Sequence, residues 1–292
     1  MRTEQEMMDL FMDIAQTDGR IRAVYMNGSR TNPNAPKDIY QDYDIVFVVT
    51  ETGSFLADKN WIQKFGRPLI VQEPDWIDNV TQWFDSAPHD STRRYAWLML
   101  FDDGNRIDLG IEIPEETLIG FTEDSLTVIL LDKDGLLPAI PPPSDSIYHV
   151  QPPSEPIFHA CCNEFWWCLN NAAKGAARDE MPYAMEMLNH YVRNMLNSAV
   201  EWYIGVQTDF SVSTGKMGKY FKRYLQPELY AQYAATYSGC DYSDIWAAIA
   251  VMCDLFHTLA LSVAARFSFT YRQDEEDGMR EYLRMVKDFP RP

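Results

Sequence analysis

The sequence predicts an α+β protein in which a strand-containing N-terminal part is followed by an all-helical C-terminal part. Up to residue 137, short runs of β-branched and aromatic residues alternate with turn signals, a pattern typical of strands. From residue 157 onward, apolar residues recur at helical spacing. Seven prolines between these parts predict a stiff, extended linker. We therefore expect domains at 1–137 and 157–292, joined by a linker at 138–156.

The elements of the N-terminal part follow from local patterns. Residues 4–16 place apolar side chains at helical spacing, which predicts an amphipathic helix. Residues 55–65 predict a short helix, and the polar stretch 78–90 is expected to be irregular. The acidic and glycine-containing turn 102–105 predicts a hairpin. Strands are expected at 21–26, 45–49, 68–71, 95–101, 106–113 and 126–131.

The C-terminal part predicts helices at 157–177, 183–206, 245–269 and 274–287. The segment 245–269 is nearly all apolar, so we expect it to be the central helix of a bundle. His257 lies inside this segment and is interpreted as a hydrogen-bonded core histidine rather than a metal ligand.

The composition limits the class of protein. With 46% hydrophobic residues the chain is expected to be globular, and we find no apolar run of the ~20 residues that a membrane span needs. The N-terminus lacks the apolar core of a signal peptide, so we expect a cytoplasmic protein that does not bind membranes. The five cysteines form no CxxC pair and the five histidines no HxxxH pair, which argues against disulfides and zinc.

An acidic pair at the start of a strand is the main chemical signal. A small-residue turn, Gly28-Ser29, follows an apolar run, and Asp42-Tyr43-Asp44 leads into the predicted strand 45–49. Alternate residues of a strand share a face, so the two carboxylates should lie about 7 Å apart. They repel each other unless a cation lies between them, and magnesium carrying a phosphate substrate suits such a pair. The alternative is a solvated acidic turn.

This arrangement resembles the active-site signature of the nucleotidyltransferase superfamily. In that superfamily a third carboxylate comes from a later strand beside the acidic pair. Asp108 fits this place, on a strand face that it shares with Gly110 and Glu112. Glu112 matches no position of the signature.

The net charge of −18 indicates which substrates fit. Proteins that hold polynucleotides usually present basic surfaces to the phosphates. An acidic chain with a phosphate-chemistry motif therefore favours a small nucleotide and a non-nucleic acceptor over a nucleic acid. The alternative is that the acidity serves solubility alone.

One dense basic cluster stands out in this acidic chain. Within 211–224, four cations occupy eight residues, beginning with Lys216 and Lys219 and ending with Arg223. The stretch does not match the P-loop pattern, because Met217 follows Lys216. Cations beside a helix N-terminus would suit a triphosphate. The alternative is a solvated basic helix face.

Taken together, these motifs resemble the aminoglycoside 6-adenylyltransferases, also called streptomycin adenylyltransferases. The resemblance extends over both parts of the chain. It lies in residues 28–34, 41–45, 106–109, 164–167, 173–175 and 211–225.

The resemblance implies a fold and a reaction. The fold is an N-terminal nucleotidyltransferase domain, with a mixed sheet flanked by helices, and a C-terminal helical bundle. The reaction is Mg²⁺-dependent transfer of AMP from ATP to the 6-hydroxyl of a streptomycin-like aminoglycoside, with release of pyrophosphate. A different small-molecule or protein hydroxyl as acceptor, and a non-catalytic nucleotide sensor, are the alternatives.

The resemblance also implies roles for single residues. Asp42 and Asp44 would hold two Mg²⁺ ions, and Asp108 would complete the ion nearer the acceptor and take the proton of its hydroxyl. ATP phosphates would contact Gly28, Ser29, Arg30, Lys216, Lys219 and Arg223.

The acceptor, a small-molecule cation, would be held by the helical part. Glu164 lies close to Trp166 and Trp167, and a carboxylate beside an aromatic face suits a guanidinium group. We therefore name Glu164 and Trp167 as candidate acceptor ligands. The alternative is that the two tryptophans belong to the core and that Glu164 pairs on a helix surface. The sequence does not determine the oligomeric state.

Overall fold

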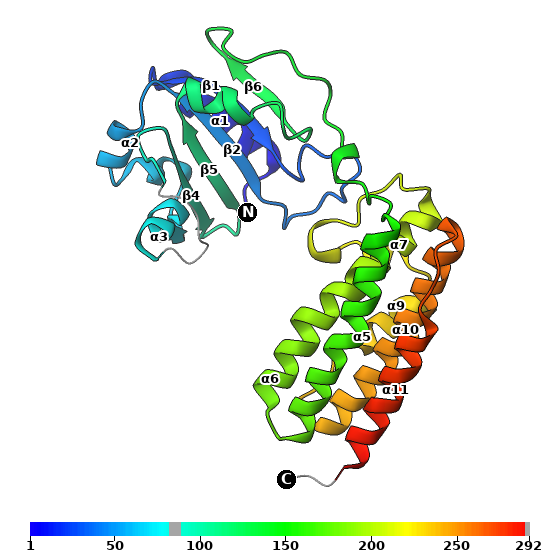
Figure 1. Ribbon diagram of the computed structural model, residues 1–292. Helices are drawn as coiled ribbons and strands as arrows, with labels where there is room; N and C mark the ends of the chain where they lie inside the picture. The colour runs from blue at the N-terminus through cyan, green and yellow to red at the C-terminus, as the bar shows by residue number, and fades with distance from the viewer. Residues whose placement is uncertain (82–88, 290–292) are drawn as a thin grey trace. The chain divides into compact units, whose positions relative to one another are not determined.

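The computed structural model describes residues 1–81 and 89–289, and the chain divides into two compact units (Figure 1). The first unit is Met1–Ile147 and the second is Tyr148–Pro292. The division falls inside the proline-rich segment 138–156 that the sequence analysis interprets as a linker.

The N-terminal unit is built on six strands, and each strand expected from the sequence is present within a few residues of its predicted bounds. The elements are α1 Glu4–Thr17, β1 Ile21–Asn27, β2 Tyr43–Val49, α2 Gly53–Ala57, η1 Trp61–Phe65, β3 Pro68–Gln72, α3 Pro74–Thr81, β4 Arg94–Phe101, β5 Arg106–Glu112, α4 Pro114–Gly120, β6 Val128–Asp132 and η2 Ser146–Tyr148.

Three local predictions differ from the structure. The helix expected at 55–65 is split into α2 and the 3₁₀ turn η1. The stretch 78–90 was expected to be irregular, but its first residues belong to α3, and 82–88 lie outside the described residues. Helix α4 was not predicted; it begins with a proline at its first turn, where the missing N–H costs no hydrogen bond.

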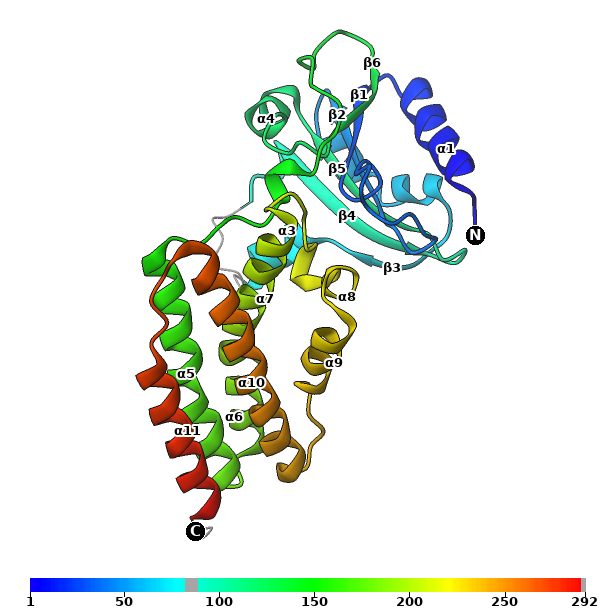
Figure 2. The same cartoon turned by 90° about the vertical axis from the view of Figure 1, so that its right-hand side faces the viewer.

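The sheet is mixed, as the family resemblance implies. Its strand order is β3-β4-β5-β2-β1-β6, with β2 and β5 parallel and the other neighbours antiparallel. Helix α1 packs through Met7 and Phe11 onto one face, together with the apolar side chains of β1, β2 and β5. Helix α4 lies on the opposite side of the sheet from α1 (Figure 2). There Phe121, directly after α4, packs against Tyr25 of β1. In this strand order the parallel pair β2–β5 occupies the middle of the sheet, with two strands on either side.

The second unit is helical, which confirms the predicted fold class. Its elements are α5 Glu155–Ala177, α6 Met181–Glu186, η3 Met187–Val192, α7 Arg193–Thr208, η4 Lys216–Gly218, α8 Phe221–Tyr224, α9 Pro227–Ala235, α10 Tyr242–Phe267 and α11 Gln273–Asp288. The helix predicted at 183–206 is continuous but contains the π-helical segment η3. The short helices α8 and α9 were not predicted.

Helix α10 is the apolar centre of this unit. Along its length, residues from Ile245 to Ala264 are buried in one cluster with α5, α7 and part of α11. Among the described residues, α10 is also the one helix long and apolar enough to cross a membrane, contrary to the expectation that no segment reaches that length. Much of its surface is covered by the neighbouring helices, as expected for a core helix.

A buried carboxylate ties α11 to this core. Glu276, 3% exposed, accepts hydrogen bonds from Tyr271 (2.8 Å) and Arg280 (2.7 Å) and pairs with His257 of α10 (2.7 Å). Burial alone would raise the pKa of Glu276, but these hydrogen bonds outweigh it and lower the pKa. Tyr271 in turn accepts from the indole N–H of Trp166 in α5 (3.1 Å). The predicted hydrogen bond of His257 is therefore confirmed, but its side chain is 34% exposed and does not belong to the core.

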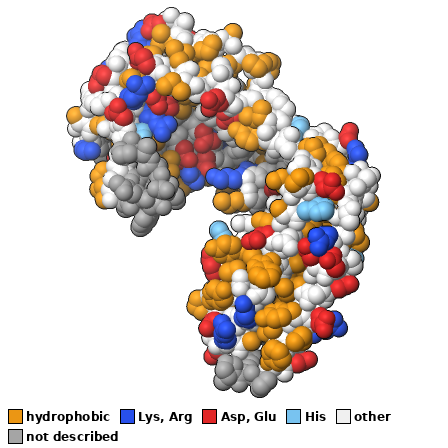
Figure 3. Space-filling view, in the orientation of Figure 1, with side chains coloured by type: hydrophobic (Ala, Val, Ile, Leu, Met, Phe, Trp, Pro, Cys, Tyr) orange, Lys and Arg blue, Asp and Glu red, His pale blue; other side chains and the backbone are white. Residues whose placement is uncertain are grey.

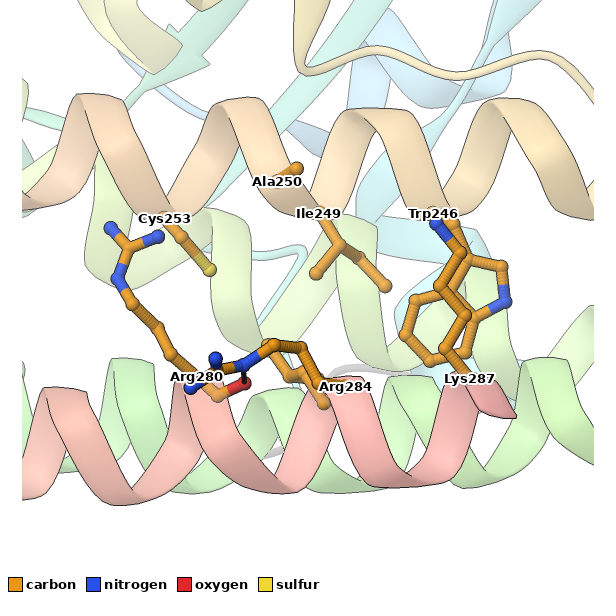
Figure 4. A pocket seen from close by; sticks show the side chains of 8 residues that line it. Trp246, Ile249, Ala250, Cys253, Arg280, Arg284 and Lys287 are labelled. Atoms are coloured by element: carbon orange, nitrogen blue, oxygen red, sulfur yellow. Dashed lines mark hydrogen bonds between the residues drawn. The ribbon is translucent and has the colours of Figure 1, made fainter. Parts of the chain in front are cut away.

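Helices α10 and α11 leave a groove of about 400 Å³ between them. Figure 4 shows Trp246 and Cys253 of α10 on one side and Arg280 and Arg284 of α11 on the other. Arg280 also forms an ion pair with Asp254 (2.8 Å), so part of the groove's positive charge is already neutralised.

Candidate active site

Two carboxylates face each other across the central parallel strands. In the β2–β5 register, Asp44 is paired with Asp108, and on its other side Asp44 is paired with Asn27 of β1. Both carboxylates lie on the sheet face opposite to α1, because their neighbours Ile45, Leu109 and Ile107 point into the α1 side. Asp108, which the resemblance to the superfamily singled out, thus lies beside Asp44.

Asp42 precedes β2, which begins at Tyr43. The alternation rule therefore applies to Asp44 but not to Asp42, whose carboxylate is positioned instead by Arg106 of β5. The Arg106 guanidinium contacts Asp42 at 3.2 Å and binds both oxygens of Asp108 at 2.8 and 2.7 Å. The three carboxylates of the sequence motif are thus gathered around one strand pair.

Arg106 is the residue of this cluster that the sequence analysis missed. It stands two residues before Asp108 on the same strand, so the period of two puts Arg106 on the same face as Asp108. With the guanidinium between the acids, the described residues contain no group of three or more His, Cys, Asp or Glu side chains already arranged as a metal site.

Among these three carboxylates, Asp44 is the one whose charged form is clearly destabilised by its surroundings. Burial, together with the negative charges of Asp108 and Asp42, raises the pKa of Asp44 to about 6, although Arg106 opposes the shift. Asp124 adds to the same repulsion. Positive charge beyond that of Arg106 would therefore stabilise the ionised form of Asp44.

Glu112 shares the strand face of Asp108 but has other contacts. Its carboxylate accepts hydrogen bonds from the hydroxyls of Tyr25 (3.0 Å) and Thr117 (3.2 Å). These contacts tie α4 to the sheet and fit the absence of Glu112 from the motif.

The backbone of Gly28 lies directly against the carboxylate of Asp44. Its backbone is left-handed, with φ 78°, and a Cβ at this position would lie 2.1 Å from a carboxylate oxygen of Asp44. The carbonyl of Gly28 accepts hydrogen bonds from the backbone and side chain of Thr31, which closes the turn. Glycine is therefore required both by the turn and by the carboxylate.

The two residues after Gly28 are held in different ways. The carbonyl and hydroxyl of Ser29 lie 3.2 and 3.4 Å from the side-chain amide of Gln41, and the residue is half-buried. Arg30 donates to the carbonyls of Gln41 and Asp42 and stacks on Tyr43 at 3.7 Å. Arg30 thus fixes the loop before β2, and contact with a phosphate remains a prediction for both residues.

The basic cluster lies on a loop of the helical unit. Lys216 belongs to the 3₁₀ turn η4, Lys219 lies 5.2 Å from the Tyr220 ring, and Arg223 lies in α8. All three side chains are exposed. Helix α8 has only four residues, so the expected contribution of a helix N-terminus to phosphate binding is not supported. The cations themselves remain candidates for the phosphates.

The candidate acceptor residues on α5 differ in their exposure to solvent. Trp166 is 2% exposed and belongs to the core, whereas the Trp167 side chain is 64% exposed. Glu164 is exposed and accepts a hydrogen bond from the Cys168 thiol at 3.1 Å. The pair that remains accessible for a ligand is therefore Glu164 and Trp167, and their role is a prediction.

Residues 1–286 match the family described as streptomycin adenylyltransferase. The chain belongs to this family. The predictions of family and enzyme class are therefore confirmed, and the carboxylate cluster is that of an adenylyltransferase.

Three curated relatives support the same assignment, each named aminoglycoside 6-adenylyltransferase. The protein of Bacillus subtilis is 36% identical over 97% of both chains. That of Campylobacter jejuni is 36% identical over 99% of this chain and 98% of its own. That of Staphylococcus aureus is 31% identical over 95% of this chain and 96% of its own.

One solved structure is also similar, the crystal structure of an aminoglycoside 6-adenyltransferase from Bacillus subtilis. It is 31% identical in sequence, with a TM-score of 0.49, and the match covers 99% of this chain and all of that one.

Figure 3 shows a group of acidic side chains on the visible face of the N-terminal unit, with basic side chains next to it.

Proposed function

We propose that this adenylyltransferase transfers AMP from ATP to the 6-hydroxyl of a streptomycin-like aminoglycoside, releasing pyrophosphate and inactivating the antibiotic. The observation that carries the proposal is the register pair of Asp44 and Asp108. It puts a half-buried carboxylate of raised pKa beside a second one, in a chain whose relatives are named for this reaction.

The carboxylates fit Mg²⁺ in donor type and in charge. Asp42, Asp44 and Asp108 offer hard oxygen donors, and the raised pKa of Asp44 indicates a site with too little positive charge. Two bound ions would neutralise the charge that develops on the phosphate and lower the pKa of the attacking hydroxyl. Arg106 contacts Asp42 and Asp108, so its guanidinium would have to yield when these oxygens bind a metal.

Asp108 is the proposed proton acceptor. Its carboxylate would take the proton from the acceptor hydroxyl as the oxygen attacks the α-phosphorus of ATP. The residue is half-buried, and Arg106 would hold its two oxygens until they bind a metal.

The Asp108→Asn variant should therefore lose kcat far more than affinity for ATP. Asn keeps the shape but cannot accept the proton, and this function is exercised only in the transition state. We expect a loss in kcat of about 10²-fold or more. Steady-state kinetics and equilibrium ATP binding measure the two quantities; an equal fall in both would make Asp108 a binding group.

The phosphates of ATP would be held by two groups of residues. Gly28 and Ser29 form the turn beside Asp44, where the absence of a Cβ allows close approach. Lys216, Lys219 and Arg223 would neutralise the leaving pyrophosphate, with Arg30 in a supporting position.

Removing Lys216 or Lys219 should weaken ATP selectively. The Lys216→Ala and Lys219→Ala variants are each expected to raise the KM for ATP about tenfold, with little change in the KM for streptomycin. Lys59→Ala, at an exposed position between α2 and η1, is a control of the same charge change. If both loop variants match the wild type in ATP kinetics, the loop is only a solvated basic surface.

The acceptor would be recognised as a cation by acidic and aromatic side chains. Glu164 and the exposed Trp167 offer one such combination on α5. Salt should weaken the attraction between the acceptor and this acidic protein.

The reaction itself is tested by supplying ATP, Mg²⁺ and streptomycin and measuring pyrophosphate and adenylylated antibiotic by mass spectrometry. Both products are expected, and chelation of Mg²⁺ should abolish them. Transfer to another hydroxyl with no reaction on streptomycin would favour the alternative acceptor. ATP binding without pyrophosphate release on any acceptor would favour a nucleotide sensor.

A further inference from the structure

The helical unit contains a pocket of about 590 Å³ beside the basic loop. Its lining comes from residues 148–151, from Glu201 and Trp202 of α7, and from residues 213–217. The backbone N–H of Val150 donates to the carbonyl of Val212 (3.0 Å), which fastens the first segment to the loop. The pocket is thus built from three segments, all within the second unit.

Glu201 is a carboxylate without a cationic partner in this pocket. It is half-buried, and in the described part of the chain its one hydrogen-bond partner is the hydroxyl of Thr214, at 3.4 Å. Burial raises the pKa of Glu201, and the single hydrogen bond only partly opposes that shift. A carboxylate that has lost water without gaining a cation destabilises the fold. The position of Glu201 is therefore better explained by binding of a ligand than by a contribution to the stability of the fold.

The neighbours of Glu201 indicate the chemistry of that ligand. Trp202 is half-buried, packs against Phe158 and lines the same pocket, so it offers an aromatic surface close to the carboxylate. A planar guanidinium can combine an ion pair with stacking on such a ring.

Lys216 gives the pocket a second charge of opposite sign. It lines the same pocket but forms no ion pair with Glu201 within 4 Å, judging from the residues that the structure describes. A triphosphate alone would be attracted by Lys216 and repelled by Glu201. A cationic ligand near Glu201, with phosphate near Lys216, satisfies both charges.

From this arrangement the structure assigns Glu201 as a specificity residue for the acceptor: its carboxylate binds a guanidinium or ammonium group of the aminoglycoside, and Trp202 provides the surface on which that group lies. This assignment rests on the proposed function, because it presupposes a cationic acceptor. It adds a residue to that site, distinct from Glu164 and Trp167.

The test is Glu201→Gln in the full-length protein, with streptomycin and ATP binding measured separately by calorimetry. Gln keeps the shape and can still accept from Thr214, so the fold should persist, which circular dichroism checks. We expect the Kd for streptomycin to rise about tenfold or more and the Kd for ATP to change less than about twofold. Glu228→Gln, which removes an exposed carboxylate from α9, should leave both values unchanged.

A second variant and a second nucleotide distinguish the other outcomes. Glu201→Asp keeps the charge and should retain more streptomycin affinity than Glu201→Gln. Weaker ATP binding with unchanged streptomycin binding, together with loss of discrimination between ATP and 2′-deoxy-ATP, would assign Glu201 to the ribose and overturn the inference. Wild-type affinity for streptomycin in Glu201→Gln also overturns it, while the proposed function stands if that protein still transfers AMP. A wild type that neither binds nor adenylylates streptomycin overturns both.

Discussion

Asp44→Asn is expected to abolish AMP transfer while the protein remains folded. Asp44 is central to the carboxylate cluster, since it is paired with Asp108 and repelled by Asp42. Replacing it by a neutral amide removes a proposed Mg²⁺ ligand and with it most of the charge stabilisation of the transition state. The expected loss in kcat/KM is about 10³-fold or more. Asp42→Asn should lose activity for the same reason.

Stability and activity must be measured together for these variants. Because burial and like charges raise the pKa of Asp44, its neutralisation should not lower the melting temperature. Glu112→Gln is the matched control, since Glu112 lies on the same face of β5 but contacts Tyr25 and Thr117 instead. A folded Asp44→Asn protein with near-normal turnover would refute the metal-site assignment.

The second large effect is expected from Gly28→Ala. An added methyl group at Gly28 would lie 2.1 Å from an oxygen of Asp44, so either the carboxylate or the turn must move. The left-handed φ of 78° adds a backbone cost of about 1 kcal/mol. Since a displacement of about 1 Å at a reacting centre can cost 10²-fold, we expect kcat/KM to fall by about that factor.

Gly19→Ala is the control for this substitution, because Gly19 also flanks β1 but a Cβ there meets no atom within 4 Å. Its kinetics should equal those of the wild type. If Gly28→Ala transferred AMP at the wild-type rate, the close contact between Gly28 and Asp44 would have no part in positioning the carboxylate.

The strands could be predicted because they depend on local periodicity, whereas Asp108 was predicted from the resemblance to the nucleotidyltransferase superfamily. Runs of β-branched, aromatic and other apolar residues predicted all six strands, and alternation on β5 placed Asp108 on the face of Gly110 and Glu112. The helical unit followed from spacings near four, and the apolar content of α10 identified the core helix.

Other features depend on contacts between distant segments, which periodicity does not encode. Arg106 shares a strand face with Asp108 by local periodicity, but its contact with Asp42 depends on the register of β2 and β5. Glu201 is the one acidic residue of α7, and only the fold shows that a loop and part of the linker line a pocket beside it. The split of 55–65 and the π-helical segment η3 show that apolar spacing cannot determine the hydrogen-bonding pattern within a helix.

The buried carboxylate of Glu276 has a consequence for how the helical unit is assembled. Its carboxylate is hydrogen-bonded to His257 of α10 and to Tyr271, which lies before α11. Tyr271 also accepts a hydrogen bond from Trp166 of α5. Before α11 docks, Tyr271 and His257 lack their common acceptor, and the apolar surfaces of α5 and α10 are incompletely covered. Local loosening of α11 alone is therefore costly. Helices α5, α10 and α11 are therefore expected to unfold as one cooperative unit, because the single carboxylate of Glu276 in α11 links the stability of α5 to that of α10.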